Sequence, residues 1–490
     1  MKLIHTINRI FDSRWFPIIC FPISVCFLLL YSNTTSPFYQ LDGCDSVIFK
    51  TMGLAILQGK TPYIDIFDHK GPVLYLINAL GQWMIPGRYG ILLLQVLSLT
   101  ITMVFLYKIS RLFINGFLSF FWLFVSICIM GVFFEGGNLT EEWNLPYLVI
   151  PLYYAMAYFS KEREKLHPIK YSLIYGLCFG MAFFIRPNDA VAQVGGVVTG
   201  VTIWLFYRKE FKNMLRSILF FFIGFMVIFI PIVSWYGLKG ALGDLYYGLL
   251  RFNAIYSEGL LHLVRSVNSR DKIKFFMFFV ALLVMIYNSS YKQLLVLLLP
   301  ILSFVVVFKG TRLYPHYYIV VVPYFLLFFV FLCLQKNKSI IICSIAVFFA
   351  SHIDTLKMAR KTPKTKIEYA INVMKNGVEE SKFYKETDKL LQYVPNEKRC
   401  KLWNYNLNFD LALLWHQGLI QANKVPLFSM YQVDKKLKEE DSIIKKSPEY
   451  VLFSEDHPKD SSDYVFILNN YDIIARTDST VCRIALFKRK

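Results

Sequence analysis

The stretch that decides the fold is GKTPYIDIFDHKGPVLY, residues 59–75. Within six positions it gathers four polar side chains and then turns apolar; these are Asp65, Asp68, His69 and Lys70. Just upstream, the run LDGCD adds Asp42 and Asp45. Since the chain around these residues is rich in hydrocarbon side chains, the stretch predicts a polar site built against a membrane.

The amino-acid composition is typical of an integral membrane protein. Of its 490 residues, 56% are hydrophobic and 17% aromatic, whereas soluble domains average about 45–50% apolar. Apolar runs of about 20 residues recur, which is typical of transmembrane helices. The net charge is +19, and because many of the cations flank apolar runs, we interpret them as groups that orient the spans and contact lipid headgroups. The sequence predicts a polytopic protein of the lipid bilayer and no binding of nucleic acid.

The spans and their orientation follow from the apolar runs and the Lys/Arg bias. We expect about eleven transmembrane helices, at 15–31, 90–107, 114–134, 143–159, 171–187, 190–207, 215–236, 273–287, 293–308, 318–334 and 339–353. Cations cluster in every second loop, which predicts that those loops and the N-terminus are cytoplasmic. The first long loop, residues 32–89, then faces outward from a bacterial inner or cell membrane. Residues 73–86 are too short to span, so this segment and residues 46–58 are predicted to be helices lying in the outer interface, with Trp83 at headgroup level.

The composition changes after residue 353, which divides the chain into a transmembrane domain at 1–353 and a soluble domain at 354–490. Charge becomes dense there, and short β-rich runs (KLWNY, YVLFS, DIIAR, CRIALF) alternate with helical ones. This pattern predicts a small α/β domain. With eleven spans and an inside N-terminus, the domain is extracytoplasmic.

The acid–lysine stretch belongs at the outer membrane–water boundary, because each charge placed in hydrocarbon would cost about 2.5–3.5 kcal/mol. A carboxylate there suits general-base work on a hydroxyl or amine. Lys70 and His69 suit a phosphate. Together they suggest group transfer from a lipid phosphate. The alternative is a solvated turn in which Asp65 and Asp68 cap the backbone.

Other outward loops contribute further candidate residues: Asn138, Glu141, Arg186, Arg312, His316 and Tyr317. Arg312 and His316 are candidates for lipid-phosphate binding, and the others for contacts with substrate. Each has a structural alternative. The polar residues of the loop at 136–144 could serve just to cap the next helix. The motif IRPND at 185–189 could be a tight turn, and the cations of KGTRLYPHYY at 309–318 could bind outer headgroups nonspecifically.

Residues 45–81 resemble the first outer loop of the C-superfamily (GT-C) of integral membrane glycosyltransferases, in the family-39-like branch of protein O-mannosyltransferases and aminoarabinose transferases. The shared pattern is an acid after the first span, an amphipathic helix ending near Gly59, the pair Pro62-Tyr63, and Lys-x-Pro at Lys70. The layout is similar over roughly residues 10–350, and the motifs are specific only over 42–81.

The resemblance implies transfer of a sugar from a polyprenyl-phosphate carrier to an envelope glycan, lipid or protein acceptor, with inversion of the anomeric centre. It implies that Asp45 is the base and that Lys70 contacts the lipid phosphate. The family's acid pair is absent because Ser46 follows Asp45, so Asp42 is an alternative base. His69 replaces an acid common in relatives.

Two questions stay open at the level of sequence. No cofactor motif is visible and we expect no cofactor, but Asp65, Asp68 and Glu141 could hold a divalent cation between acids and phosphate. The alternatives to a transferase are a lipid-linked glycan polymerase, ligase or flippase, and a non-enzymatic envelope scaffold. The sequence identifies neither the sugar nor the acceptor.

Overall fold

The computed structural model describes residues 11–490 except 12, 14–15, 40–43, 164, 262–268, 292, 295–297, 302–313, 379–381, 406–411, 427–428, 456–461 and 478–482. The chain divides into two compact units, each assembled from separate stretches of sequence. Unit 1 contains residues 1–32, 93–239 and 260–370, and unit 2 contains residues 33–92, 240–259 and 371–490.

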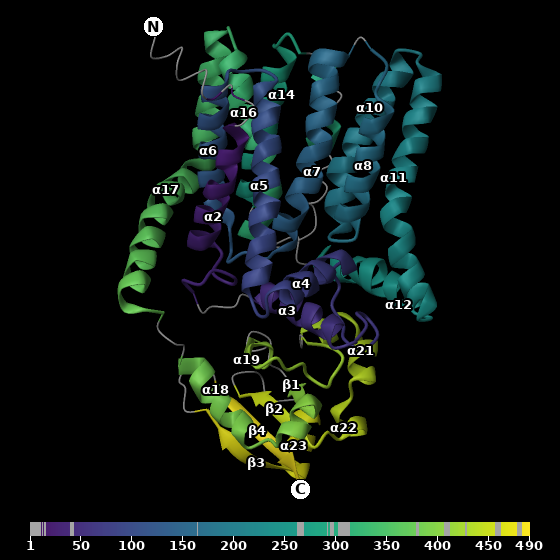
Figure 1. Ribbon diagram of the computed structural model, residues 1–490, viewed down its shortest axis with the longest axis vertical. Helices are drawn as coiled ribbons and strands as arrows, with labels where there is room; N and C mark the ends of the chain where they lie inside the picture. Colours follow the sequence, from purple (N-terminus) through teal and green to yellow (C-terminus); the bar gives the residue numbers. More distant parts are fainter. Residues whose placement is uncertain are drawn as a thin grey trace. The chain divides into compact units, whose positions relative to one another are not determined.

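Unit 1 is built from helices, several of which run side by side (Figure 1). Its described elements are η1 (Phe16–Ile19), α2 (Cys20–Tyr31), α5 (Tyr89–Arg111), α6 (Gly116–Phe133), α7 (Thr140–Ala157), η2 (Tyr158–Glu162), α8 (Ile169–Phe183), α9 (Pro187–Asp189), η3 (Ala190–Gly195), α10 (Gly196–Tyr207), α11 (Phe211–Leu238), α14 (Ser269–Tyr287), η7 (Pro315–Val321), α16 (Val322–Leu334) and most of α17 (Lys338–Asn376).

Five helical segments among the described residues are long and apolar enough to cross a membrane: Tyr89–Arg111, Gly116–Phe133, Pro187–Tyr207, Phe211–Leu238 and Pro315–Leu334. Shorter apolar helices cover Pro17–Tyr31, Ile169–Phe183, Phe276–Tyr287 and Lys338–Ala350. These positions agree with nine of the predicted spans, whereas most of the span predicted at 293–308 lies outside the described residues. The total of eleven spans and their orientation stay predictions.

Close packing within unit 1 depends on small residues where helices α8 and α11 meet. A Cβ on Gly176 would lie 1.9 Å from the carbonyl oxygen of Phe221, and a Cβ on Gly224 would lie 2.2 Å from that of Leu173. Only glycine therefore fits at either position. Such close backbone approach is typical of helix pairs in membranes, where lipid is as apolar as the side chains and packing has to provide the attraction.

Unit 2 combines the segment around the acid–lysine stretch with the C-terminal segment. Its described helices are α3 (Cys44–Leu57), α4 (Pro72–Met84), α12 (Leu242–Tyr246), η4 (Tyr247–Arg251), α13 (Phe252–Leu261), α18 (Lys382–Gln392), η8 (Asn396–Lys401), α19 (Ala412–His416), α20 (Ser429–Val433), α21 (Lys435–Glu440), α22 (Ile443–Lys446) and α23 (Ser462–Asn470). Helices α3 and α4 pack against each other and confirm the two helices predicted at 46–58 and 73–86. Their place at the membrane interface stays a prediction.

The C-terminal segment contains the four predicted strands, β1 (Trp403–Tyr405), β2 (Tyr450–Ser454), β3 (Tyr471–Arg476) and β4 (Ile484–Arg489). They form one sheet in the order β1-β2-β4-β3, seen at the C-terminus in Figure 1. Strands β1 and β2 are parallel, and the other neighbours are antiparallel. The sheet core, which includes Val451, Phe453 and Phe487, packs on Ile467 of α23. The small α/β region is therefore confirmed. The boundary predicted at residue 353 lies within α17, directly after non-helical dihedral angles at His352, and stays a prediction.

Candidate functional site

The structure gathers half of the predicted site residues into two clusters, one in each unit. The lysine cluster of unit 2 consists of Asp68, His69, Lys70 and Tyr75. The arginine cluster of unit 1 consists of Glu141, Arg186, Asp189 and Tyr317. Asp42 and Arg312 lie outside the described residues.

The turn that leads into the lysine cluster is held by its own backbone and by Asp65. Thr61 N–H donates to Asp65 Oδ2 at 2.6 Å, and Tyr63 N–H donates to the carbonyl of Ile66 at 2.7 Å. Tyr63 is buried and adopts φ +70°, a left-handed conformation that costs a non-glycine residue about 1–3 kcal/mol. Asp65 itself is exposed. The contacts of Asp65 thus match the turn-capping alternative for that residue.

Helix α4 begins directly after Lys70, with Gly71 as its N-cap and Pro72 in its first turn, a position that proline favours. The start of the helix brings the Tyr75 hydroxyl back onto the polar residues. It donates to Asp68 Oδ2 at 2.8 Å and accepts from Lys70 N–H at 3.0 Å. The Tyr63 hydroxyl donates to the carbonyl of Lys70. Two tyrosines therefore fix the backbone on which Lys70 sits.

His69 links the acid to the lysine. Its Nε2 lies 2.8 Å from Lys70 Nζ, and its Nδ1 lies 3.3 Å from Asp68 Oδ1. A lysine ammonium can only donate, so Nε2 accepts and the imidazole proton is on Nδ1, facing Asp68. Phe252 and Tyr256 pack against the ring with centroids 5.5 Å away, and Asn253 Nδ2 donates to the His69 carbonyl at 2.7 Å.

The pKa shifts agree with a neutral imidazole between two charged groups. Burial, and then the charge of Lys70, lowers the pKa of His69. Burial alone would raise the pKa of Asp68, but the contact with His69 and the charge of Lys70 outweigh it and lower that pKa to about 2. Burial and the charge of Asp68 raise the pKa of Tyr75 well above its usual range, so its hydroxyl stays a donor.

Asp45 lies in the first turn of α3 and is half-buried. The charge of Asp45 acts to raise the pKa of His69, which places the carboxylate within electrostatic reach of the lysine cluster. Asp45, His69 and Lys70 thus belong to the same compact unit.

In the arginine cluster, one guanidinium lies between two carboxylates. Arg186 Nη1 contacts Glu141 Oε1 and lies 3.6 Å from Asp189 Oδ1. The guanidinium also lies over the Tyr317 ring, 4.7 Å from its centroid. Asn144 Nδ2 donates to the second oxygen of Asp189 at 3.0 Å. All these side chains except that of Tyr317 are almost or wholly buried, so the arginine is compensated within the cluster.

The loop before α7 has its own network, which includes Asn138. Gly136, Gly137 and Asn138 all have φ between +58° and +86°. Glu142, in the first turn of α7, accepts from Asn138 N–H at 2.8 Å and from Gln95 Nε2 at 2.7 Å. This is the helix-capping arrangement in which an acid reaches back to the preceding backbone.

The side chain of Asn138 is used in the same loop, since its Oδ1 accepts from Trp143 Nε1 at 2.9 Å. A neighbouring acid binds the predicted histidine: His316 Nδ1 lies 2.5 Å from Glu135 Oε2.

Neither cluster forms a metal centre by itself. Within the described parts of the chain, no group of three or more His, Cys, Asp or Glu side chains is arranged to hold a metal ion. Asp65 is used by the turn, and Asp68 contacts Tyr75 and His69. A divalent cation therefore stays a prediction.

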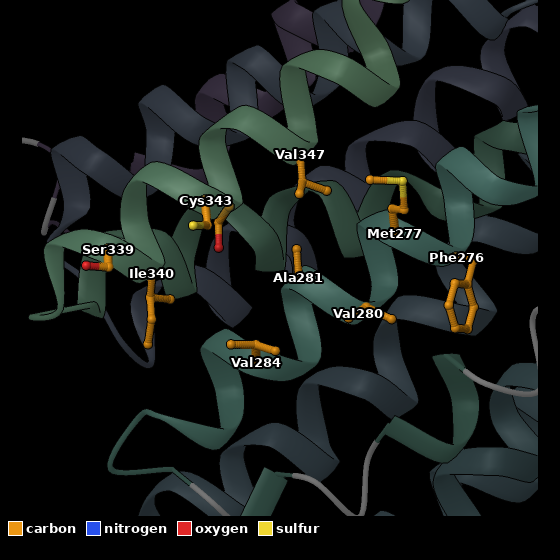
Figure 2. Close-up of a pocket in the computed structure, with 10 residues that line it drawn as sticks. Phe276, Met277, Val280, Ala281, Val284, Ser339, Ile340, Cys343 and Val347 are labelled. Atoms are coloured by element: carbon orange, nitrogen blue, oxygen red, sulfur yellow. The ribbon is translucent and has the colours of Figure 1, made fainter.

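Unit 1 also contains an apolar hollow of about 440 Å³ between α14 and α17. Figure 2 shows Met277, Ala281, Val284 and Val347 lining it from the two helices. The described lining residues carry no charge. The hollow suits hydrocarbon and offers no cation to a phosphate.

Sequence reasoning missed several partners of the predicted residues. Tyr63, Tyr75 and Asp189 were within motifs already quoted, and Asp189 follows Arg186 by three positions, a spacing that puts helical side chains on one face. Gln95 and Asn253 lie far away in the chain and gave no local signal.

No protein-family model and no curated protein sequence matches the chain. Among solved structures, the chain is similar to ArnT of Cupriavidus metallidurans bound to undecaprenyl phosphate, with a TM-score of 0.60 and 10% identity over 97% of this chain and 98% of that one. The chain has the ArnT fold. The apo form of the same ArnT gives a TM-score of 0.60 and 10% identity over 96% of this chain and 97% of that one. The oligosaccharyltransferase of Archaeoglobus fulgidus gives a TM-score of 0.48 and 12% identity over 90% of this chain and 70% of that one.

The resemblance of the sequence to the GT-C integral membrane glycosyltransferases is thus confirmed at the level of fold. The likeness to ArnT extends over nearly the whole of both chains. Together with the apolar helices, this likeness in fold supports an integral membrane protein.

Proposed function

We propose that the chain is an inverting glycosyltransferase that moves a sugar from a polyprenyl-phosphate carrier to an envelope glycan, lipid or protein acceptor. The observation that carries the proposal is the lysine cluster, with Asp45 in its electrostatic reach, in a chain with the ArnT fold. The ArnT structure contains undecaprenyl phosphate, which is a polyprenyl phosphate, and this supports the same class of donor here.

Lys70 is our candidate for the phosphate of the donor. Its ammonium contacts a neutral imidazole, and Asp68 lies on the other side of that ring, so the positive charge is not cancelled by direct contact with a carboxylate there. As the bond between sugar and phosphate breaks, negative charge grows on the phosphate and a fixed cation stabilises it. His69 and the two tyrosines position the lysine.

Asp45 is our candidate for the base, with Asp42 as the alternative. In the proposed step, the carboxylate takes the proton of the acceptor hydroxyl or amine while that atom attacks the anomeric carbon from the face opposite the phosphate. The bond to the phosphate oxygen breaks and its electron pair leaves with the polyprenyl phosphate. Both sugar inversion and charge balance follow from this arrangement, and no cofactor is needed.

The other predicted residues have supporting roles in this proposal. Arg186 and Glu141 organise the arginine cluster around Tyr317, and Asn138 shapes the loop before α7. His316 is a second candidate for binding phosphate. We propose that the N-terminus is cytoplasmic and that the first outer loop and residues 354–490 are extracytoplasmic, as the distribution of basic loops predicts.

The test uses purified protein in lipid discs with a panel of labelled polyprenyl-phosphate sugars and envelope extract as acceptor. The wild type should consume one donor. Asp45→Asn should lower the rate by about 10²–10⁴-fold, the usual contribution of a positioned base. Lys70→Ala should lower kcat by about 10²–10³-fold, as for other groups that stabilise transition-state charge.

Matched controls come from the C-terminal sheet. Asp472 and Lys488 are exposed and face each other on strands β3 and β4, so Asp472→Asn and Lys488→Ala remove the same charges away from the lysine cluster and should keep the wild-type rate. If Asp45→Asn stays active and Asp42→Asn does not, the base is Asp42. If no donor is consumed beside an active control enzyme, the proposal is wrong.

A further inference from the structure

Unit 2 contains a hollow of about 420 Å³, within the range of small-ligand sites. One side is formed by the C-terminal end of α4 and the start of α5. The other side is formed by α19 and the turn that follows it. The residues that decide its chemistry are Tyr39, Gln82, Arg88, Tyr89, Trp415 and His416. We call it the Arg88 pocket. It is separate from the lysine cluster, because the two lie at opposite ends of α4, whose 13 residues span about 20 Å.

The walls of the Arg88 pocket are built by contacts between distant parts of the chain. Trp415 Nε1 donates to Gln82 Oε1 at 2.9 Å, and Gln82 Nε2 donates to the Lys50 carbonyl at 2.9 Å. Lys50 Nζ, fully buried, lies 4.1 Å from the centroid of the Trp415 ring. Arg88 Nη1 donates to the Tyr39 carbonyl at 3.0 Å. These contacts fix the arginine and the indole before any ligand binds.

The charge of the pocket favours an anion. Arg88 and His416 line it, and none of its described lining residues is acidic. Gly87, Arg88 and Tyr89 lead into α5, a helix of 23 residues whose N-terminal end adds partial positive charge. An arginine at such a place is suited to bidentate contact with a phosphate.

The position of the pocket favours a lipid. Helix α5 is long and apolar enough to cross a membrane and begins at Tyr89, so the residues around its start lie at the membrane boundary. Leu76, Leu80 and Trp83 form an apolar face of α4, with exposed fractions of 40%, 45% and 72%. Their spacing puts them on one side of the helix. Acyl chains can cover this face of α4 while a headgroup enters the pocket at the C-terminal end of the same helix.

We propose that the Arg88 pocket binds the phosphate-bearing headgroup of a membrane lipid, in addition to the donor carrier. The lipid is held by Arg88 through its phosphate, by the aromatic rings of Tyr89 and Trp415 around the headgroup, and by the apolar face of α4 along its tails. This inference does not rest on the proposed transferase activity.

The test measures binding of dihexanoyl phosphatidic acid to the full chain in maltoside micelles by calorimetry. The protein carries Lys70→Ala, which removes the proposed donor-phosphate contact and leaves the second site. We expect saturable binding of one lipid. Arg88→Gln should weaken it by about 10- to 100-fold, the usual effect of a charge-assisted contact, and Arg88→Lys by less.

Arg489→Gln is the matched control, because Arg489 also donates to a backbone carbonyl, that of Ser447, but lies in strand β4 and does not line the pocket; it should bind like its parent. Glycerol 3-phosphate, which lacks the tails, and dihexanoylglycerol, which lacks the phosphate, should each bind at least tenfold more weakly. Equal binding by either compound, or unchanged binding in both Arg88 variants, would overturn the proposal.

A second measurement covers variants that do not fold. A diazirine derivative of phosphatidic acid, photolysed with the Lys70→Ala protein in lipid discs, should label peptides that contain residues 82–89 or 415–418. Labelling confined to other peptides would overturn the assignment of the site.

Discussion

Replacing Asp68 by asparagine tests the electrostatics of the lysine cluster most directly. The carboxylate is 1% exposed, and its pKa falls from 3.8 to about 2 in the folded protein. A depression of this size corresponds to about 2 kcal/mol of stabilisation of the charged form in the folded protein. Asparagine keeps an acceptor for Tyr75 but removes the stabilisation of the charged carboxylate, so Asp68→Asn should lower the free energy of unfolding by about 2 kcal/mol at pH 7.

The sign of the pH dependence follows from the direction of the shift. Since the folded pKa of Asp68 lies below the unfolded one, its stabilisation is complete above about pH 5 and is lost as the pH falls through 3.8 toward 2. The difference between wild type and Asp68→Asn should therefore be constant from pH 5 to pH 8 and shrink below pH 4. For a unit of about 150–250 residues, the difference at pH 7 corresponds to a Tm lower by roughly 4–8 °C.

The assay is thermal unfolding in maltoside micelles, followed by tryptophan fluorescence at several pH values. Asp65→Asn is the control, because Asp65 is exposed and makes one hydrogen bond to the backbone of its turn; it should cost about 1 kcal/mol or less. The reasoning is refuted if Asp68→Asn destabilises no more than Asp65→Asn at pH 7, or if its effect is unchanged near pH 3.

Three further predictions test the packing and the buried polar contacts. Glu141→Gln should destabilise by about 3 kcal/mol because it leaves the buried Arg186 short of a partner, and adding Arg186→Gln should recover part of that loss in a thermal melt. Gly53→Ala should cost about 1–3 kcal/mol, since its Cβ would lie 2.7 Å from backbone atoms of α4. Gly243→Ala has no atom within 4 Å of its Cβ and should melt like the wild type. Trp415→Phe should lower the free energy of unfolding by about 1 kcal/mol, because the 2.9 Å hydrogen bond to Gln82 is lost. A Tm equal to or above that of the wild type would contradict this role.

The sequence predicted most of the local structure because the signals are local. Apolar runs predicted the helices, including the one at 73–86 that corresponds to α4, and β-branched and aromatic runs predicted the strands at 450–454 and 472–476. It did not predict that residues 33–92 and the C-terminal segment belong to one compact unit, since the contacts that join them, such as Trp415 to Gln82, link residues more than 300 positions apart.

The roles within the candidate site were harder to predict than its residues. Asp65 and Asp68 look alike in sequence, three positions apart. Yet one is exposed and caps a turn, while the other is buried against Tyr75 and His69. Burial and partner distinguish them, and the partner Tyr75 is brought back to Asp68 by the first turn of α4.

The same comparison separates the two cations that the sequence offered for binding substrate. Arg186 contacts two buried carboxylates, so an anion that took the arginine would leave those carboxylates without their counter-charge, at a cost of several kcal/mol. Lys70 contacts an imidazole whose pKa is lowered by burial and by the lysine itself, and an anion that approached it would displace no carboxylate from direct contact. A phosphate should therefore bind at Lys70 in preference to Arg186. Accordingly, Lys70→Ala should weaken donor binding with little change in stability, whereas Arg186→Gln should do the reverse.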